Sequence, residues 1–128
     1  MGQRSSAAVR YLLAIYRLSE GGRPVRSVDI AGKLAVSPAS VAHMLGVLAG
    51  EGLIAKRHYG RVLLTGRGVR LASRLYTSWV LMECFFSQHL GVCQQTARAD
   101  AEACLCALSR ETMDRLEALV LEGDAAVV

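Results

Sequence analysis

The sequence contains no apolar run long enough to cross a membrane, although its apolar content is high. Of its 128 residues, 52% are hydrophobic, yet uninterrupted apolar runs hold only a handful of residues, such as Trp79–Met82. A transmembrane helix needs roughly 20 apolar residues. The N-terminus has no apolar stretch of signal-peptide length, because Arg10 and Arg17 interrupt it. We therefore expect a cytoplasmic protein without a membrane partner.

Catalytic and redox motifs are also missing. The three histidines, His43, His58 and His89, fall on separate expected elements and form no cluster with a nucleophile, and no glycine loop could cradle a phosphate. We therefore expect no enzymatic activity. No C-x-x-C pair occurs among the four cysteines, which we expect to be mostly buried thiols rather than disulfides. They are Cys84, Cys93, Cys104 and Cys106.

Charge is divided unevenly along the chain. Residues 1–70 hold eleven Lys and Arg against three acids, a net charge of +8, whereas residues 71–128 hold four Arg against eight acids, a net charge of −4. A basic half favours binding to a polyanion, and nucleic acid is the commonest one.

Apolar residues at helical spacing predict two helices before residue 35. The first covers residues 6–19 and ends at the turn Glu20–Pro24. The second covers about residues 28–34, with Ser27 as its N-cap and Asp29 in its first turn, where a negative charge suits the helix dipole.

A third helix is predicted from the pair Ser37-Pro38. Serine is a good N-cap, and proline fits the first helical position because its missing N–H has no partner there in any case. The helix continues to the glycines Gly50 and Gly52. Two short helices joined by a tight turn form a helix-turn-helix motif.

The next residues predict a wing and a helical region. Two extended runs between residues 53 and 64 hinge at Tyr59-Gly60, which indicates a β-hairpin with a cationic tip. Thr65 then caps a new helix with Gly66 and Gly68 in its first turn, and one long helix is expected from Val69 to about Leu90. A second helix is expected at about residues 97–108, and Ser109–Thr112 opens a third.

The expected fold is therefore mainly α. A winged helix-turn-helix domain covers residues 1–70, a helical dimerisation domain covers 71–123, and 124–128 form a tail. The apolar stripes of the C-terminal helices predict a homodimer, because pairing two copies would bury them.

Two groups of residues are candidates for binding double-stranded DNA. The start of the second helix of such a motif reaches base edges in the major groove, which points to Ser37, Ala39, Ser40 and His43. Cations on neighbouring elements would contact phosphates and supply salt-dependent affinity. These are Arg26, Lys33, Lys56, Arg57, His58, Arg61 and Arg67. A winged helix used only for protein contacts is the alternative.

Five short motifs in order resemble the diphtheria toxin repressor and manganese transport regulator family of metal-dependent repressors. They are Ala14-Ile15-Tyr16, Asp29-Ile30-Ala31, Val36-Ser37-Pro38, Gly52-Leu53-Ile54 and Leu64-Thr65-Gly66-Arg67-Gly68. The resemblance runs from about Ala7 to Leu119. It implies a homodimeric repressor that binds a palindromic operator, of the short type without an SH3-like domain.

The same resemblance implies a site for Mn(II) or Fe(II) whose ligand positions are mostly changed here. The family's positions fall on Arg10, Trp79, Glu83, Arg98, Glu102, Leu105 and Cys106. Only Glu83, Glu102 and Cys106 could act as ligands, because arginine stays protonated and the other side chains have no suitable donor atom. The cofactor is therefore either absent or a transition metal (Mn, Fe or Zn) at an altered site.

Two hypotheses for the switch remain open. In the first, Arg10 and Arg98 replace the missing ions by pairing with Glu83 or Glu102, which makes DNA binding metal-independent. In the second, cysteines form a sensor for a thiophilic metal, haem or an oxidant. Cys104 and Cys106 diverge by roughly 200° around a helix, whereas Cys106 and Glu102 share a face. Cys84 and Cys93 could join them from neighbouring segments or the other subunit.

Overall fold

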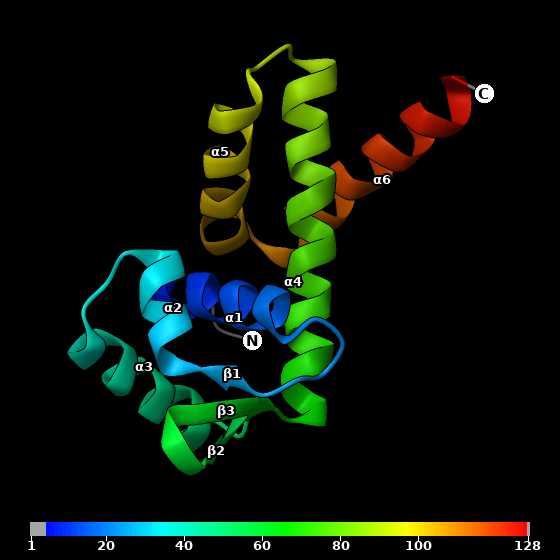
Figure 1. Ribbon diagram of the computed structural model, residues 1–128. Helices are drawn as coiled ribbons and strands as arrows, with labels where there is room; N and C mark the ends of the chain where they lie inside the picture. The colour runs from blue at the N-terminus through cyan, green and yellow to red at the C-terminus, as the bar shows by residue number, and fades with distance from the viewer. Residues whose placement is uncertain (1–4, 128) are drawn as a thin grey trace. The chain divides into compact units, whose positions relative to one another are not determined.

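The computed structural model describes residues 5–127, which form six α-helices, three short strands and two irregular helical turns (Figure 1). The described part of the chain divides into two compact units, and the boundary falls within the helix α4 (Gly66–Cys84), between Arg74 and Leu75. Among the described residues no single helix is long and apolar enough to span a membrane. One bent pair of helices, Ser27–Leu34 and Pro38–Gly50, has the length and apolar composition of a span when its two helices are taken together.

The N-terminal unit packs three helices against a small antiparallel sheet. The helices are α1 (Ser6–Ser19), α2 (Ser27–Leu34) and α3 (Pro38–Gly50), and the strands are β1 (Val25–Arg26), β2 (Ile54–Arg57) and β3 (Arg61–Leu64), in the order β1-β3-β2. Fully buried Leu12, Ile15, Ile30, Leu48 and Leu53 form the centre of its core. The winged helix-turn-helix predicted from the sequence is confirmed.

The turn between α2 and α3 gives the motif its shape. Ala35 adopts a left-handed conformation (φ 54°) at the end of α2, and the two helices are bent by 113°. The hydroxyl of Ser37 accepts a hydrogen bond from the backbone N–H of Ser40 at 3.1 Å, and Pro38 is the first residue of α3. The predicted cap is therefore confirmed.

Ser27, by contrast, is not the N-cap of α2. Arg26 holds that position without a side-chain cap, and Ser27 is the first helical residue. The reason is β1, a two-residue strand that the sequence did not reveal: Arg26 is extended because it pairs with Arg61 of β3. The Ser27 hydroxyl lies instead against Gly60, where an added Cβ would come within 3.1 Å of it.

The wing is the β2–β3 hairpin. Its tip is a single turn, η1 (His58–Gly60), in which Tyr59 and Gly60 have φ angles of 61° and 67°. Only a left-handed backbone closes so short a connection, and glycine meets that requirement without strain. The ring of Tyr59 is 93% exposed.

The start of α4 (Gly66–Cys84) is fastened to the segment that follows α3. The Thr65 hydroxyl donates to the carbonyl of Gly52 at 2.7 Å and accepts from the N–H of Gly68 at 3.0 Å. The predicted cap at Thr65 is therefore confirmed. The regular part of the helix stops at Cys84, earlier than the expected end near residue 90, and a π-helical turn, η2 (Phe85–His89), follows.

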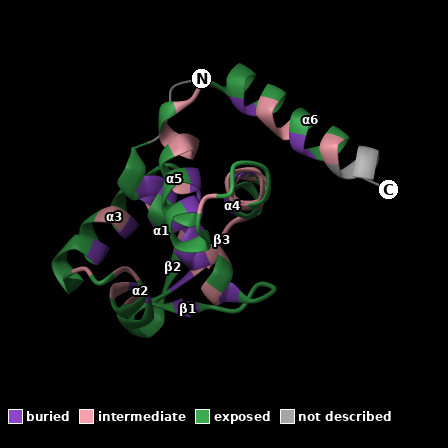
Figure 2. Cartoon of the chain, turned by 90° about the horizontal axis from the view of Figure 1, so that it is seen from above, coloured by how far each residue is buried: buried purple, intermediate pink, exposed green. Residues whose placement is uncertain are grey.

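The C-terminal unit contains the end of α4, η2, α5 (Gln94–Ala107) and α6 (Arg110–Val127). Its core is built around Met82, Ala101, Met113 and Val120. Figure 2 shows the buried positions of α6 on one side of the helix. The expected tail is helical as far as Val127, and Val128 lies outside the described residues.

Candidate DNA-binding surface and effector site

The exposed side of α3 carries the residues expected to read bases. Ala39, Ser40 and His43 are exposed, while Val41 and Leu45 are buried on the other side of the helix and fix its orientation. The Ser37 hydroxyl donates to Ser40 Oγ at 3.0 Å in addition to its capping bond. No Lys or Arg occurs in α3, so this helix offers small groups and one imidazole rather than the guanidinium that commonly reads guanine.

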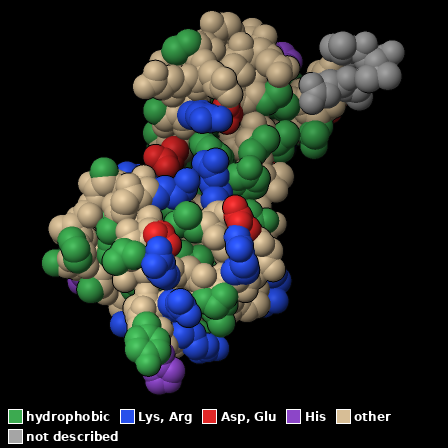
Figure 3. Space-filling model, viewed as in Figure 1, with side chains coloured by type: hydrophobic (Ala, Val, Ile, Leu, Met, Phe, Trp, Pro, Cys, Tyr) green, Lys and Arg blue, Asp and Glu red, His purple; other side chains and the backbone are tan. Residues whose placement is uncertain are grey.

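Three arginines form a row across the sheet. Arg26 of β1 lies opposite Arg61 of β3, and Arg61 lies opposite Arg57 of β2. Residues directly opposite in an antiparallel pair point to the same face, and like charges there repel each other. All three are exposed, and Figure 3 shows Lys and Arg side chains gathered on the face that carries the strands. We refer to Arg26, Arg57 and Arg61 as the arginine row.

Local contacts hold two members of the row. Arg26 pairs with Asp29 through Nε and Nη2 at 3.1 and 3.2 Å, and this hydrogen bond, together with the charge of Asp29, raises the pKa of the guanidinium. Arg57 Nη1 donates to the carbonyl of Lys56 at 3.3 Å. Sequence reasoning found each of these cations but not the row, because the pairing of β1 joins residues far apart in the chain.

The other predicted phosphate-binding residues are more dispersed. Lys56 and His58 are exposed on β2 and at the tip of the wing, and Lys33 is exposed in the last turn of α2. Arg67, at the start of α4, donates to the carbonyl of Glu51 at 3.2 Å, so it also fastens α4 to the end of α3.

A polar cluster in the C-terminal unit contains two of the predicted effector residues. Glu83 Oε1 accepts hydrogen bonds from Arg98 Nε and from Gln94 Nε2, both at 3.3 Å. The Glu83 side chain is only 16% exposed and that of Arg98 is 54% exposed. Trp79 Nε1 donates to the backbone carbonyl of Arg98 at 3.1 Å. The pairing with Glu83 was anticipated, whereas the roles of Gln94 and Trp79 were not.

The other candidate effector residues are spread over α1, α4 and α5. Cys84 and Cys104 pack against the core cluster around Met82, and burial, followed by the charge of Asp100, raises the pKa of the Cys104 thiol. Cys106 and Glu102 are half-buried on α5, and Arg10 is exposed on α1. All four cysteines are free thiols, but the expectation that most are buried is wrong, because three are half-buried and Cys93 is exposed.

These donors do not fit a resident metal ion. Among residues 5–127, no group of three or more His, Cys, Asp or Glu side chains is arranged to hold one. The carboxylate most suited to be a ligand, Glu83, already accepts a cationic N–H and an amide N–H at the same oxygen. A divalent first-row ion requires several such donors.

A bent helix pair beside a basic wing defines the class of winged-helix DNA-binding proteins. Two family models match the chain in succession: the N-terminal DNA-binding domain of the iron-dependent repressors over residues 5–62, and the metal-binding and dimerisation domain of the same repressors over residues 65–122. The chain therefore belongs to the iron-dependent repressor family, a family of transcriptional regulators and not of enzymes.

Individual relatives agree with this assignment. An uncharacterized HTH-type transcriptional regulator of Methanocaldococcus jannaschii is 29% identical over 84% of this chain and 86% of the relative. The transcriptional regulator MntR of Escherichia coli O157:H7 is 40% identical over 70% of this chain and 57% of its own length. The Bacillus subtilis regulator MntR is 33% identical over 86% of this chain and 77% of its own length.

Solved structures show the same architecture. The manganese regulator SloR superposes with a TM-score of 0.78 at 32% identity, covering 94% of this chain and 54% of SloR. A hypothetical protein of Sulfolobus solfataricus superposes with a TM-score of 0.68 at 26% identity, covering 91% of this chain and 89% of that protein. The chain thus spans about half of SloR but nearly all of the archaeal protein.

Proposed function

We propose that this protein is a repressor that binds a palindromic operator as a homodimer, with α3 in the major groove and the arginine row on the phosphate backbone. The arginine row is the observation that carries this proposal. Three arginines on adjacent strands, one of them already paired with Asp29, concentrate positive charge on this face, and phosphates that approach it release counterions. The cytoplasmic location expected from the sequence stays a prediction.

Base recognition in this proposal depends on a few exposed groups of α3. His43 would donate from one ring nitrogen to a base edge, the Ala39 methyl would contact a thymine methyl, and Ser40 would contact either a base or a phosphate. Because these contacts are few, sequence discrimination should be modest and phosphate contacts should supply most of the affinity.

Dimerisation is supported by apolar side chains left exposed in the C-terminal unit. Val80 on α4, Leu90 after η2, and Leu119 and Leu121 on α6 are between 41% and 59% exposed. Pairing with a second copy would remove this apolar area from water, and a two-fold dimer would match a palindromic operator.

We also propose that DNA binding does not require a divalent metal, because Arg98 supplies a fixed positive charge beside Glu83. The ion pair is partly shielded from solvent on the Glu83 side, so the attraction is stronger than that of an open surface pair. Glu83 is therefore balanced by a charge that cannot dissociate from the protein.

One experiment tests the DNA proposal and the metal proposal. An operator is selected from a random duplex pool, and its affinity is measured by fluorescence anisotropy in EDTA and in excess Mn(II), alongside elemental analysis of the protein. We expect equal affinities and no stoichiometric metal. Loss of binding in EDTA with recovery in Mn(II) would contradict metal independence, and failure to enrich any duplex at low salt would favour a protein-interaction module.

Variants of the arginine row sharpen the test. Arg57→Ala and Arg61→Ala should each reduce the slope of log affinity against log salt by about 1, the value for one phosphate contact. Arg115→Ala is the matched control, because Arg115 is an exposed arginine of α6 in the C-terminal unit. An equal reduction in all three variants would indicate a general charge effect and contradict the assignment of the row.

A further inference from the structure

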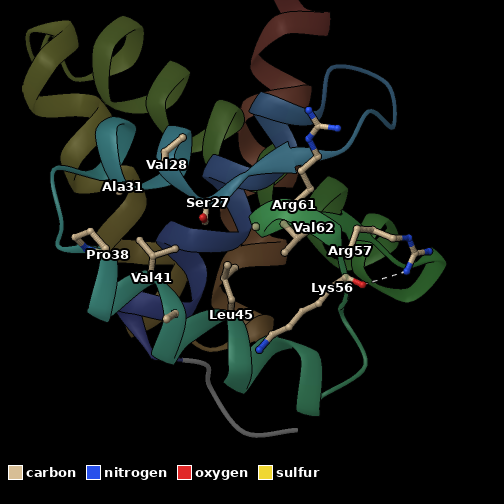
Figure 4. Close-up of a pocket in the computed structure, with 12 residues that line it drawn as sticks. Ser27, Val28, Ala31, Pro38, Val41, Leu45, Lys56, Arg57, Arg61 and Val62 are labelled. Atoms are coloured by element: carbon tan, nitrogen blue, oxygen red, sulfur yellow. Dashed lines mark hydrogen bonds between the residues drawn. The ribbon is translucent and has the colours of Figure 1, made fainter.

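A cavity of about 470 Å³ lies between α2, α3 and the wing (Figure 4). This volume falls within the range of small-molecule sites, about 300–1,000 Å³. Its walls are mainly apolar, and Val41, Leu45 and Val62 are buried at its floor. Val28, at 64% exposed, lies at its rim. The cavity is therefore an open hollow whose floor is already formed by the core.

The rim of the cavity carries groups that attract a negatively charged ligand. Figure 4 shows the Lys56 side chain extending from the wing past Leu45 toward α3. Ser27 and Val28, the first two residues of α2, also line the cavity, and no side chain caps this helix, so the positive end of its dipole lies beside the cavity. None of the lining residues, all in the described part of the chain, is acidic. An anionic group and an apolar body are thus both accommodated.

We propose that this cavity binds a small organic anion with an apolar body, such as an aromatic carboxylate or sulfonate, and that the bound anion weakens DNA binding. The ligand would occupy Lys56, which is otherwise available to phosphate, and would lie between the recognition helix and the wing. The effect on DNA rests on the proposed function, whereas binding to the cavity does not.

Two fluorescent probes with the same apolar body test the anion requirement on the full chain. The first is 1-anilinonaphthalene-8-sulfonate, and the second is uncharged N-phenyl-1-naphthylamine. Lys56→Met keeps most of the apolar stem but removes the charge, so it should weaken the sulfonate at least about fivefold, roughly 1 kcal/mol, and leave the neutral probe unchanged. An equal effect on both probes, or on neither, overturns the role of the Lys56 charge; Arg57 and Arg61 also line the cavity and remain in this variant.

A variant that fills the cavity tests whether the sulfonate probe binds there. Ala42 lines the cavity from an exposed position of α3, whereas Ala39 is exposed on the same helix outside it. Ala42→Leu should abolish sulfonate binding, and Ala39→Leu should retain it, with unchanged helical circular dichroism and melting in both variants. Wild-type sulfonate affinity in folded Ala42→Leu would overturn the site.

The regulatory step is tested separately, by titrating the selected operator with and without saturating sulfonate probe. We expect DNA affinity to fall at least tenfold in the wild type and to be unaffected by the probe in Ala42→Leu. Unchanged wild-type affinity overturns the regulatory step. Absence of DNA binding without any probe would instead contradict the proposed function, and the two failures are therefore distinguishable.

Discussion

Gly68, in the first turn of α4, permits the closest backbone approach that we find among the described residues. A Cβ at this position would lie 1.9 Å from the carbonyl oxygen of Leu53 and 3.0 Å from its carbonyl carbon. That carbonyl also accepts the N–H of Thr65 at 3.0 Å. Gly68→Ala therefore has to push α4 away from the segment between α3 and the wing.

The expected magnitude is the balance of three effects. Alanine gains about 1 kcal/mol over glycine in helix propensity. Forcing a methyl into a filled position costs about 1–3 kcal/mol, and the loss of the hydrogen bond to Leu53 costs about 1 kcal/mol more. Gly68→Ala should therefore lower the free energy of unfolding by about 1–3 kcal/mol.

Gly66→Ala is the matched control, two residues away in the same turn. A Cβ there meets only the end of the Arg70 side chain, at 3.5 Å, which is ordinary contact distance. Its stability should be unchanged or rise by up to about 1 kcal/mol. Urea unfolding followed by circular dichroism measures both variants. If Gly68→Ala is as stable as Gly66→Ala, the inferred close packing of α4 on Leu53 is wrong.

Three further predictions concern α3 and the thiols. Ser37→Ala removes the cap of α3 and should lower the free energy of unfolding, measured in urea, by about 1 kcal/mol. Unchanged stability would show that the cap does not stabilise the protein. Gly46→Ala adds a methyl to α3 at a position where nothing lies within 4 Å. It should raise the free energy of unfolding by about 0.5–1 kcal/mol yet weaken operator binding, because the methyl would stand between α3 and the DNA. Undiminished binding would show that the side of α3 that carries Gly46 does not contact DNA. Hydrogen bonding to Thr96, from its hydroxyl and then its backbone, lowers the pKa of exposed Cys93, whereas burial and then Asp100 raise that of Cys104. A disulfide reagent near neutral pH should therefore modify Cys93 before Cys104, and Thr96→Val should slow the reaction of Cys93. Faster modification of Cys104 would contradict the assignment of Cys93 as the more reactive thiol.

The sequence revealed the helices of the N-terminal unit because their signals are local. The pair Ser37-Pro38 fixed the start of α3 from two adjacent residues, and that start is where the structure places it. The strand β1 gave no such signal. It contains only two residues, and it exists because Val25 and Arg26 pair with Val62 and Arg61 across the fold. The arginine row and the misplaced cap at Ser27 both follow from this one non-local pairing.

The C-terminal unit was predictable in outline and less so in detail. Apolar spacing indicated a helix through residue 90, but spacing cannot distinguish a regular last turn from the π-helical turn Phe85–His89, because both continue the apolar side. The pair Arg98–Glu83 was one of several pairings that charge alone allowed. The amide of Gln94 joins it because Gln94 opens α5 one turn before Arg98, a position that the expected helix start at residue 97 had excluded.

If Arg98 occupies a metal-ligand position, as the resemblance to the family implies, the control of this protein changes. A bound ion reports its own concentration because it leaves the site when that concentration falls, whereas a guanidinium attached to α5 stays beside Glu83 at any metal concentration. If the Arg98–Glu83 ion pair stabilises the C-terminal unit as a bound ion would, this unit cannot respond to metal availability. A ligand that acts on the DNA-binding unit itself is then one route of control, and the cavity between α3 and the wing is where it would contact both the recognition helix and a cation of the wing.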